Sequence, residues 1–472
     1  MSTGKVMRVR YDFNNLMVDA IGPEHGLTIG EIEEAIPLLE EADRWLKARR
    51  AVGELNWMEL PYHSQVHRQV IAFAERARNR FENLAVLGIG GSALGNIALH
   101  TALTHPFYNL LPAERRGGPR LFVLDNVDPD LFAGFLDLVD PTQTLYCVSS
   151  KSGTTAETMA QFLIVQKLLR ERLGPAHAGH FVLVTDERKG YLRQIAEREG
   201  YESFIVPEGV GGRFSVLSPV GLVSAAMCGI DVSSLLAGAA FGDERTRDAD
   251  PWRNPAYMNG LLQYLLYRKG KHILVMMPYS QRLRDVADWF RQLWAESLGK
   301  QLNRAGQVVH VGPTPIKALG VTDQHSQVQL YVEGPYDKVI NFLFVEQYDH
   351  QVDLPAAYPD LDGVAYLGGH TLNELIRAEA EATALALTAA SRPNCAYILP
   401  AVNAFTVGQL LYILEVQTAI SGPLYDVDPF DQPGVEAGKI ATYALLGRKG
   451  YEARRQEIIE QRKKKRDRFI IA

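Results

Sequence analysis

Short runs of consecutive apolar residues, separated by longer amphipathic segments, constrain the fold of this chain most strongly. A strand that is apolar on both faces is typical of a parallel sheet covered by helices on both sides. The pattern therefore predicts an α/β fold with parallel sheets arranged as two α/β/α sandwiches. The expected strands form two sets, at residues 84–87, 121–124, 145–148, 181–184 and 204–206, and at residues 273–277, 308–311, 328–332, 340–345 and 396–399.

A chain of 472 residues is too long for a single hydrophobic core, so we expect several domains. Helical periodicity before residue 60 predicts a helical N-terminal region, and two prolines among charged residues at 248–255 indicate a junction. We expect the division to be a helical region at 1–60, a first α/β domain at 61–250, a second at 251–420, and a C-terminal segment with a helical arm at 421–472.

Composition narrows the class of protein. A formal net charge of −6 gives no electrostatic reason to expect nucleic acid as a partner, and the basic cluster at 462–466 is interpreted as a solvated helix end. The three cysteines, Cys147, Cys228 and Cys395, are odd in number and far apart, which favours a reducing compartment over a disulfide scaffold.

Two segments bear on where in the cell the protein is found. Residues 1–10 lack an apolar run behind their charges, so we expect no signal peptide. The uncharged stretch 396–414 is interrupted by Pro400 and Asn403, and we interpret it as a strand, a loop and a buried helix that does not span a membrane. We expect a cytoplasmic protein with no membrane partner.

The glycine-rich turn at 88–93 follows an expected strand and precedes a helix-like run. Backbone amides there could bind an anion, and the spacing fits the loose dinucleotide fingerprint. The acid that this fingerprint requires about 20 residues later is missing, since the next strand ends only at Asp125. Close packing of the strand against the helix explains the glycines equally well, and binding of NAD is the alternative hypothesis for a ligand.

Residues 149–155 carry five hydroxyl side chains, a glycine and Lys151 between a strand and a helix. Hydroxyls and free amides at the positive end of a helix favour a phosphate, whereas a polar helix cap without a ligand is the simpler interpretation. Thr154 and Glu157 have the spacing of a capping box. The nucleotide P-loop spacing is missing, so a monophosphate is favoured over ATP.

Three further residues are candidates for chemistry. Glu296 lies near the end of the helix-like run 282–299, four residues after Gln292, where nearby tryptophans could desolvate a general base. Arg213 follows two glycines, and His325 lies in an expected loop before the strand 328–332. Taken alone, each is more commonly an ordinary surface residue.

Histidine spacing tests for a metal. His63 and His67 are four residues apart, but no acidic residue in zincin fashion and no third ligand accompany them. We assign no metal.

Three segments together resemble the signatures of the phosphoglucose isomerase family, in its shorter bacterial-type branch. They are SKSGTT at 150–155, EGVGGRFS at 208–215 and FDQPGVEAGK at 430–439, and the resemblance covers about residues 84–439. It implies two sugar-isomerase (SIS-type) domains, a homodimer with its active site at the subunit interface, and no cofactor.

The resemblance also implies a reaction, the reversible conversion of glucose 6-phosphate into fructose 6-phosphate through a cis-enediol, in glycolysis and gluconeogenesis. Glu296 matches the base, and His325 the histidine that reaches the neighbouring subunit's site and assists ring opening. Lys439 matches the lysine near the ring oxygen, and Arg213 the arginine that stabilises the enediolate. The matching phosphate-loop positions are Ser92, Ser150, Lys151, Ser152 and Thr155, and further pocket positions are Glu157, Gln292 and Gln432.

Two rival hypotheses remain besides NAD binding. A sugar-phosphate sensor with the same domains would keep the hydroxyl loop without needing Glu296, His325 and Lys439 together. An aminosugar isomerase of the amidotransferase type would need an ammonia source, and no cysteine lies near Met1.

Overall fold

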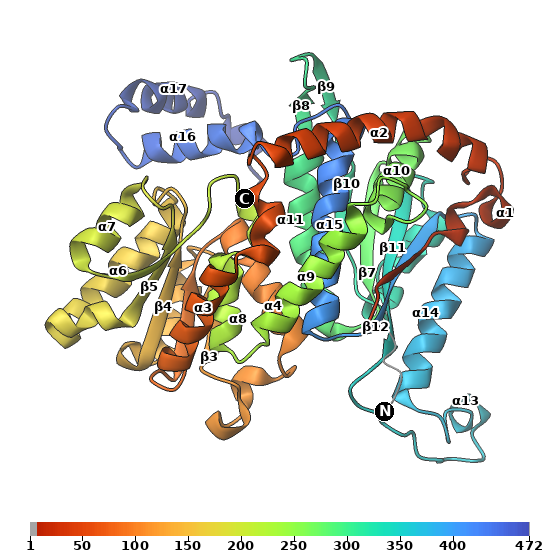
Figure 1. Cartoon of the computed structure of the whole chain (residues 1–472), viewed down its shortest axis with the longest axis horizontal. Helices are drawn as coiled ribbons and strands as arrows, with labels where there is room; N and C mark the ends of the chain where they lie inside the picture. The colour runs from red at the N-terminus through yellow and green to blue at the C-terminus, as the bar shows by residue number, and fades with distance from the viewer. Residues whose placement is uncertain (1–6, 472) are drawn as a thin grey trace.

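The computed structural model describes residues 7–471 (Figure 1). The first sheet is entirely parallel, with the strand order β3-β2-β4-β5-β6. Its five strands confirm the first set expected from the sequence: β2 (Asn83–Leu87), β3 (Arg120–Leu124), β4 (Thr144–Ser149), β5 (Phe181–Thr185) and β6 (Glu202–Ile205).

Helices cover both faces of this sheet, which explains the unbroken apolar runs. Along β2, Ala85 and Leu87 belong to one buried cluster, whereas Leu84 and Val86 belong to another on the opposite face. The first cluster includes residues of α5 (Pro129–Leu138), α6 (Ala156–Leu173) and α7 (Tyr191–Glu199), and the second residues of α3 (Ser64–Ala77), α4 (Leu94–Leu103) and α8 (Pro219–Met227).

The second sheet has the order β1-β12-β11-β7-β10 and is parallel except for β1, which pairs antiparallel with β12. The helices between and around its strands are α9 (Val232–Thr246), α10 (Pro255–Arg268), α11 (Arg284–Leu298), α13 (Asp362–Ala365), α14 (Leu372–Ala389) and α15 (Ala404–Leu424). Its strands are β1 (Arg10–Asp12), β7 (Ile273–Pro278), β10 (Thr314–Lys317), β11 (Lys338–Gln347) and β12 (Asn394–Ala401).

One expected strand of this set was wrong, and another lies outside the sheet. Residues 328–332 form the helix α12 (Val328–Glu333), in which Val328, Tyr331 and Val332 pack on the core at helical spacing. Residues 308–311 do form a strand, β9 (Val308–Val311), but it pairs with β8 (Lys300–Leu302) in a separate hairpin. Val308 is 64% exposed there, so its apolar character does not reflect a buried sheet.

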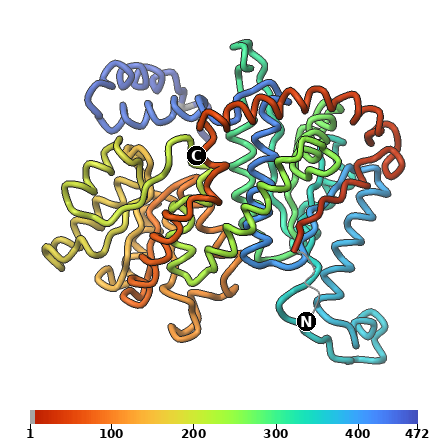
Figure 2. Tube along the Cα trace, in the orientation of Figure 1, coloured from red at the N-terminus to blue at the C-terminus, as the bar shows by residue number. Residues whose placement is uncertain are grey.

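The helical ends of the chain are present as expected. The N-terminal region contains α1 (Val18–Ile21) and α2 (Ile29–Ala51), and α2 runs beside the C-terminal half of the molecule (Figure 2). The C-terminal arm consists of α16 (Glu436–Leu445) and α17 (Glu452–Arg462), which lie above the first sheet at the upper left of Figure 1. The basic cluster begins at Arg462, the last residue of α17, and is exposed.

The uncharged stretch near the C-terminus is folded as a strand and a buried helix, as expected. The stretch 396–414 forms part of β12 and of the almost fully buried α15. Among residues 7–471, none of the helices has both the length and the apolar character needed to cross a bilayer. The expectation about a signal peptide concerns residues 1–10, of which 1–6 lie outside the described residues.

The chain connections place a crevice at the first sheet. From β2 the chain proceeds to β3 on one side, whereas β4, β5 and β6 follow on the other side. Ligands in open α/β sheets bind at the carboxyl ends of the strands where the order reverses, which here lies between β2 and β4. The turns that follow these two strands are the glycine-rich turn and the hydroxyl-rich loop.

Candidate active site

The hydroxyl-rich loop after β4 is closed by its own side chains. The Ser150 and Thr155 hydroxyl oxygens are 3.1 Å apart, and Ser150 Oγ accepts the Gly153 N–H at 3.0 Å. Ser152 and Thr154 form a second hydroxyl pair at 2.8 Å. The loop is therefore a preformed, compact turn at the carboxyl edge of the sheet.

Glycine is required inside this loop. Gly153 has φ +63°, and a Cβ added there would lie 2.1 Å from the backbone nitrogen of Leu192. The loop is thus packed directly against the first residues of α7.

The capping box expected at Thr154 and Glu157 was wrong. The N-cap residue of α6 is Thr155, one position later, and its side chain makes no capping hydrogen bond. Thr155 instead contacts Ser150, so the first amides of an 18-residue helix have no side-chain cap. Such amides, with the helix dipole behind them, favour an anion.

A cavity of about 550 Å³ opens beside this loop and brings together residues distant in sequence. Lys439 of α16 lines it, with its Nζ 2.8 Å from a carboxylate oxygen of Glu436 and its side chain half exposed. The Tyr443 hydroxyl donates to the Thr154 carbonyl at 3.4 Å and links α16 to the loop. The predicted site residues that line this cavity are Ser152, Thr155, Glu157 and Lys439.

Arg213 is the centre of a second cluster and is only 3% exposed. Its guanidinium donates to Ser297 Oγ at 2.8 Å, to Glu296 Oε2 at 3.3 Å and to Gln432 Oε1 at 2.8 Å. It also donates to the Pro429 and Asp431 carbonyls at 2.5 and 2.9 Å. Burial lowers the pKa of Arg213, an effect that the charge of Glu296 opposes. With each of its five N–H groups engaged, the guanidinium is held rigidly.

Glu296 lies in the last turn of α11 and faces this cluster. Its two carboxylate oxygens accept from Gln292 Nε2 at 3.0 Å and from Arg213 Nη1 at 3.3 Å. The expectation of an apolar pocket around it was wrong, because Trp289 and Trp294 point into the core while the Glu296 side chain is 32% exposed. The carboxylate is oriented by hydrogen bonds instead.

Backbone contact joins the glycine-rich turn to Arg213. A Cβ on Gly91 would lie 2.1 Å from the Gly212 carbonyl oxygen, and a Cβ on Gly90 would lie 3.0 Å from Gln292 Nε2. The close approach that these glycines permit is therefore to other parts of the chain, which supports the packing interpretation of the turn. Ser92 ends this turn, and Ile89 lines the cavity beside the hydroxyl loop.

Lys300 was not predicted from the sequence. Its Nζ donates to the Glu296 and Asp431 carbonyls, both at 2.7 Å, and pairs with the Asp431 carboxylate at 3.1 Å. Burial lowers its pKa. Its position four residues after Glu296, just beyond the end of α11, was the available signal. Lys300 ties α11 to the segment that follows α15.

Lys151 does not point into the cavity. Its Nζ donates to the Pro207 and Val210 carbonyls, at 3.4 and 3.1 Å, and burial lowers its pKa. It joins the hydroxyl loop to the segment before Arg213.

His325 lies apart from both clusters. It ends a short 3₁₀ turn, Thr322–His325, after the carboxyl end of β10, and is exposed. The neighbouring Gln324 anchors the turn by donating to the Tyr279 hydroxyl at 2.7 Å and the Glu379 carbonyl at 3.0 Å. Glu296 is twelve residues beyond the start of α11, which follows the carboxyl end of β7, so ~18 Å of helix separates it from that edge of the sheet.

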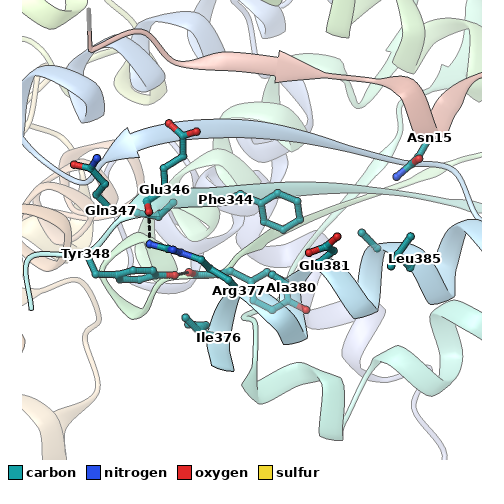
Figure 3. Close-up of a pocket in the computed structure, with 13 residues that line it drawn as sticks. Asn15, Phe344, Glu346, Gln347, Tyr348, Ile376, Arg377, Ala380, Glu381 and Leu385 are labelled. Atoms are coloured by element: carbon teal, nitrogen blue, oxygen red, sulfur yellow. Dashed lines mark hydrogen bonds between the residues drawn. The ribbon is translucent and has the colours of Figure 1, made fainter. Parts of the chain in front are cut away.

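A larger cavity of about 680 Å³ lies elsewhere, between β11 and α14 (Figure 3). Tyr348, Phe344 and Leu385 line it, and Arg377 donates to the Glu346 carbonyl at its rim. None of the predicted site residues lines it, so its size alone does not make it the candidate site. Among the described residues, no group of three side chains could ligate a metal.

Comparison with known proteins decides the family. The family model described as phosphoglucose isomerase matches residues 71–454. The chain belongs to the phosphoglucose isomerase family. The resemblance inferred from the three sequence segments is thereby confirmed.

Two curated members of the phosphoglucose isomerase family are similar over almost their whole length. The glucose-6-phosphate isomerase of Carboxydothermus hydrogenoformans is 47% identical over 466 residues, covering 98% of this chain and 100% of that relative. The glucose-6-phosphate isomerase of Rubrobacter xylanophilus is 47% identical over 453 residues, covering 94% and 99%.

Solved structures agree on the fold. A hypothetical protein from Thermus thermophilus has a TM-score of 0.82 at 39% identity, covering 93% of this chain and 100% of that one. A glucose-6-phosphate isomerase from Chlamydia trachomatis has a TM-score of 0.80 at 23% identity, covering 94% and 89%, and it supports the fold alone.

Proposed function

We propose that this member of the phosphoglucose isomerase family interconverts glucose 6-phosphate and fructose 6-phosphate. The observation that carries the proposal is the Glu296 carboxylate, held by Arg213 and Gln292 next to the turn that borders the hydroxyl loop. Aldose–ketose isomerisation needs one base, one fixed cation and an anchor for the phosphate. These clusters supply all three, and curated relatives at 47% identity carry the name glucose-6-phosphate isomerase.

In the proposed reaction, Glu296 removes the proton from C2 of the open-chain aldose. The C2–H electron pair forms the C1–C2 double bond of a cis-enediol while the C1=O π pair moves to the C1 oxygen, which takes up a proton. The C2 hydroxyl then gives up its proton as the C2=O bond forms, and the same carboxyl returns its proton to C1 to give the ketose. Arg213 stabilises the negative charge that develops on the enediolate oxygen. Because the arginine is already immobilised, little reorganisation accompanies the step.

The phosphate binds at the hydroxyl loop in this proposal. Ser150, Ser152 and Thr155 supply hydroxyls, and the uncapped start of α6 supplies amides. The binding energy of this remote group positions the sugar for proton transfer. Lys439, on the opposite wall of the cavity, is proposed to approach the ring oxygen, and Ser92, Glu157, Gln292 and Gln432 are proposed to complete the pocket. Lys151 supports the hydroxyl loop through its bonds to the Pro207 and Val210 carbonyls.

His325 is proposed to act in the site of a second subunit. Within one chain, the length of α11 separates Glu296 from the edge of the second sheet near which His325 lies. This separation argues against a contact between the two residues of the same chain. A homodimer in which each subunit lends His325 to the other would complete both sites, and an imidazole suits acid–base assistance to ring opening. A cytoplasmic location and a role in glycolysis and gluconeogenesis accord with this substrate.

The first test is a coupled assay with EDTA present. Purified protein is given fructose 6-phosphate, and the appearance of glucose 6-phosphate is followed through an NADP-linked dehydrogenase. We expect turnover at an ordinary enzymatic rate, and absence of turnover would contradict the proposed function.

The second test separates an enzyme from a sugar-phosphate sensor. Glu296→Gln keeps the shape of the side chain and its contact with Arg213 but cannot accept the C2 proton. We expect turnover to fall by at least about a thousandfold while calorimetric binding of fructose 6-phosphate persists. Turnover close to that of the wild type would exclude Glu296 as the base.

A further inference from the structure

Phe430 connects the N-terminal helix α2 to the surroundings of Arg213. Its ring stacks with that of Trp45 at 6.2 Å and 10° and lies 5.5 Å from the ring of Phe214. The guanidinium carbon of Arg49 lies 4.7 Å from the Trp45 ring and 5.0 Å from the Phe430 ring. Phe430 is therefore held by α2 on one side and by the residue after Arg213 on another.

Asp428 adds a polar link between the same partners. One carboxylate oxygen accepts from Arg49 Nη1 at 3.1 Å, and the other accepts the backbone N–H of Phe430 at 2.9 Å. Arg49 thus fixes the carboxylate that shapes the backbone turn at Phe430, as well as contacting the ring itself.

The carbonyls on either side of Phe430 are the ones that hold Arg213. The Pro429 and Asp431 carbonyls accept from the same guanidinium nitrogen, at 2.5 and 2.9 Å. A shift of Phe430 would move both acceptors together and turn the guanidinium. A change of this size close to the reacting atoms is costly, since a displacement of about 1 Å can cost up to a hundredfold in rate.

We propose that Arg49 is a positioning residue for catalysis, acting through Asp428 and Phe430 on the orientation of Arg213. This inference rests on the proposed isomerase function. Arg49 lies on α2, outside the cavity that the substrate would occupy, and its side chain is 24% exposed. Its second partner is the 53% exposed side chain of Glu54, at 2.6 Å, which provides a matched control.

The test compares kcat and KM for Arg49→Met and Arg49→Lys. Because Arg213 acts on charge that develops in the transition state, Arg49→Met should lower kcat by about tenfold and change KM by less than about twofold. Lysine can pair with Asp428 and lie against the rings, so Arg49→Lys should recover part of the lost rate.

Glu54→Gln removes the other ion pair of Arg49 and should leave kcat unchanged. Asp428→Asn should reproduce the loss seen in Arg49→Met, and the double variant should be no slower than the slower single one, because both act through the same turn. Additive losses, an equal loss in Glu54→Gln, or a lower melting temperature with an unchanged kcat would overturn the proposal. The wild-type rate in the same assay tests the isomerase function separately.

Discussion

Arg213 shows how a single buried side chain can organise a site. Its donors reach α11 through Glu296 and Ser297, and they reach the segment after α15 through two carbonyls and Gln432. A planar fork of donors meets this geometry, whereas an ammonium group cannot reach so many fixed acceptors.

Replacing Arg213 by lysine should therefore impair catalysis far more than substrate binding. The charge is retained, but the fixed orientation toward the enediolate is lost, and we expect kcat to fall by about a hundredfold or more. Steady-state kinetics measures this. A matched Arg-to-Lys change at Arg120, which bonds to the Asn83 amide oxygen and the Glu82 carboxylate at the amino ends of β2 and β3, should leave kcat unchanged. Equal effects at both positions would contradict the assignment.

His100 makes folding stability depend on pH. Burial lowers its pKa from 6.5 to about 4, and Nε2 of its ring is buried without a partner among the described residues. The unfolded chain binds the proton more readily, so the contribution is complete above pH 6.5 and is lost as the pH falls toward 4. The free energy of unfolding should fall by about 2 kcal/mol between pH 7 and pH 5 from this residue alone.

Urea unfolding of His100→Phe at the two pH values checks this, since phenylalanine keeps the ring packed against Tyr108. The variant should lose about 2 kcal/mol less than the wild type over that range. His370→Phe, at a side chain that is 60% exposed, serves as the control. Identical pH dependence in wild type and His100→Phe would refute the assignment.

At the scale of elements, the hydroxyl loop depends on one glycine. Gly153→Ala places a methyl group 2.1 Å from the Leu192 nitrogen and must displace the loop from α7. We expect KM for fructose 6-phosphate to rise by about tenfold, because the phosphate anchor moves while Glu296 and Arg213 do not.

Gly200→Ala is the matched control. Gly200 also has a positive φ, +70°, but an added Cβ meets no atom within 4 Å. This variant should lose about 1 kcal/mol of stability from backbone strain and keep its KM. A KM shift in both variants would indicate a general effect of strain instead of a local one.

The sequence predicted strands well where burial on both faces was the cause of the apolar run. The first sheet followed from this pattern, and β7, β11 and β12 did as well. Residues 328–332 misled because a six-residue helix with one buried face is as apolar over a short window as a strand. β10 was missed because Thr314–Lys317 contains a proline and a lysine and sits at the edge of the sheet.

Site residues were predictable to the extent that they belong to local signatures. Glu296, Gln292, Arg213 and Gln432 do meet in space, and so do Lys439 and the hydroxyl loop. The contacts of Lys300 with Asp431, and of Arg49 with Asp428, join segments more than 100 residues apart. No periodicity or spacing in the sequence encodes such contacts.

At the scale of the whole molecule, the separation of His325 from Glu296 predicts complementation between subunits. Glu296→Gln and His325→Asn homodimers should each be nearly inactive. When the two are mixed, unfolded and refolded together, half of the dimers should be hybrids with one intact site, restoring about a quarter of wild-type activity.

Activity of the mixture is measured in the same coupled assay, with each variant refolded alone as the control. A mixture that remains as inactive as its components would show that both residues serve the site of the same chain. The length of α11 would then no longer support a site shared between subunits.

The contact of Gly91 with Gly212 limits how the pocket can be redesigned. Two main chains touch there with no side chain between them, and glycine is already the smallest residue, so trimming cannot bring them closer. A side chain on Gly91 would push the glycine-rich turn away from the turn that carries Arg213, because its Cβ would lie 2.1 Å from the Gly212 carbonyl oxygen. Laboratory evolution toward bulkier sugars should therefore find its tolerated changes on the α16 wall, leaving Gly91 untouched.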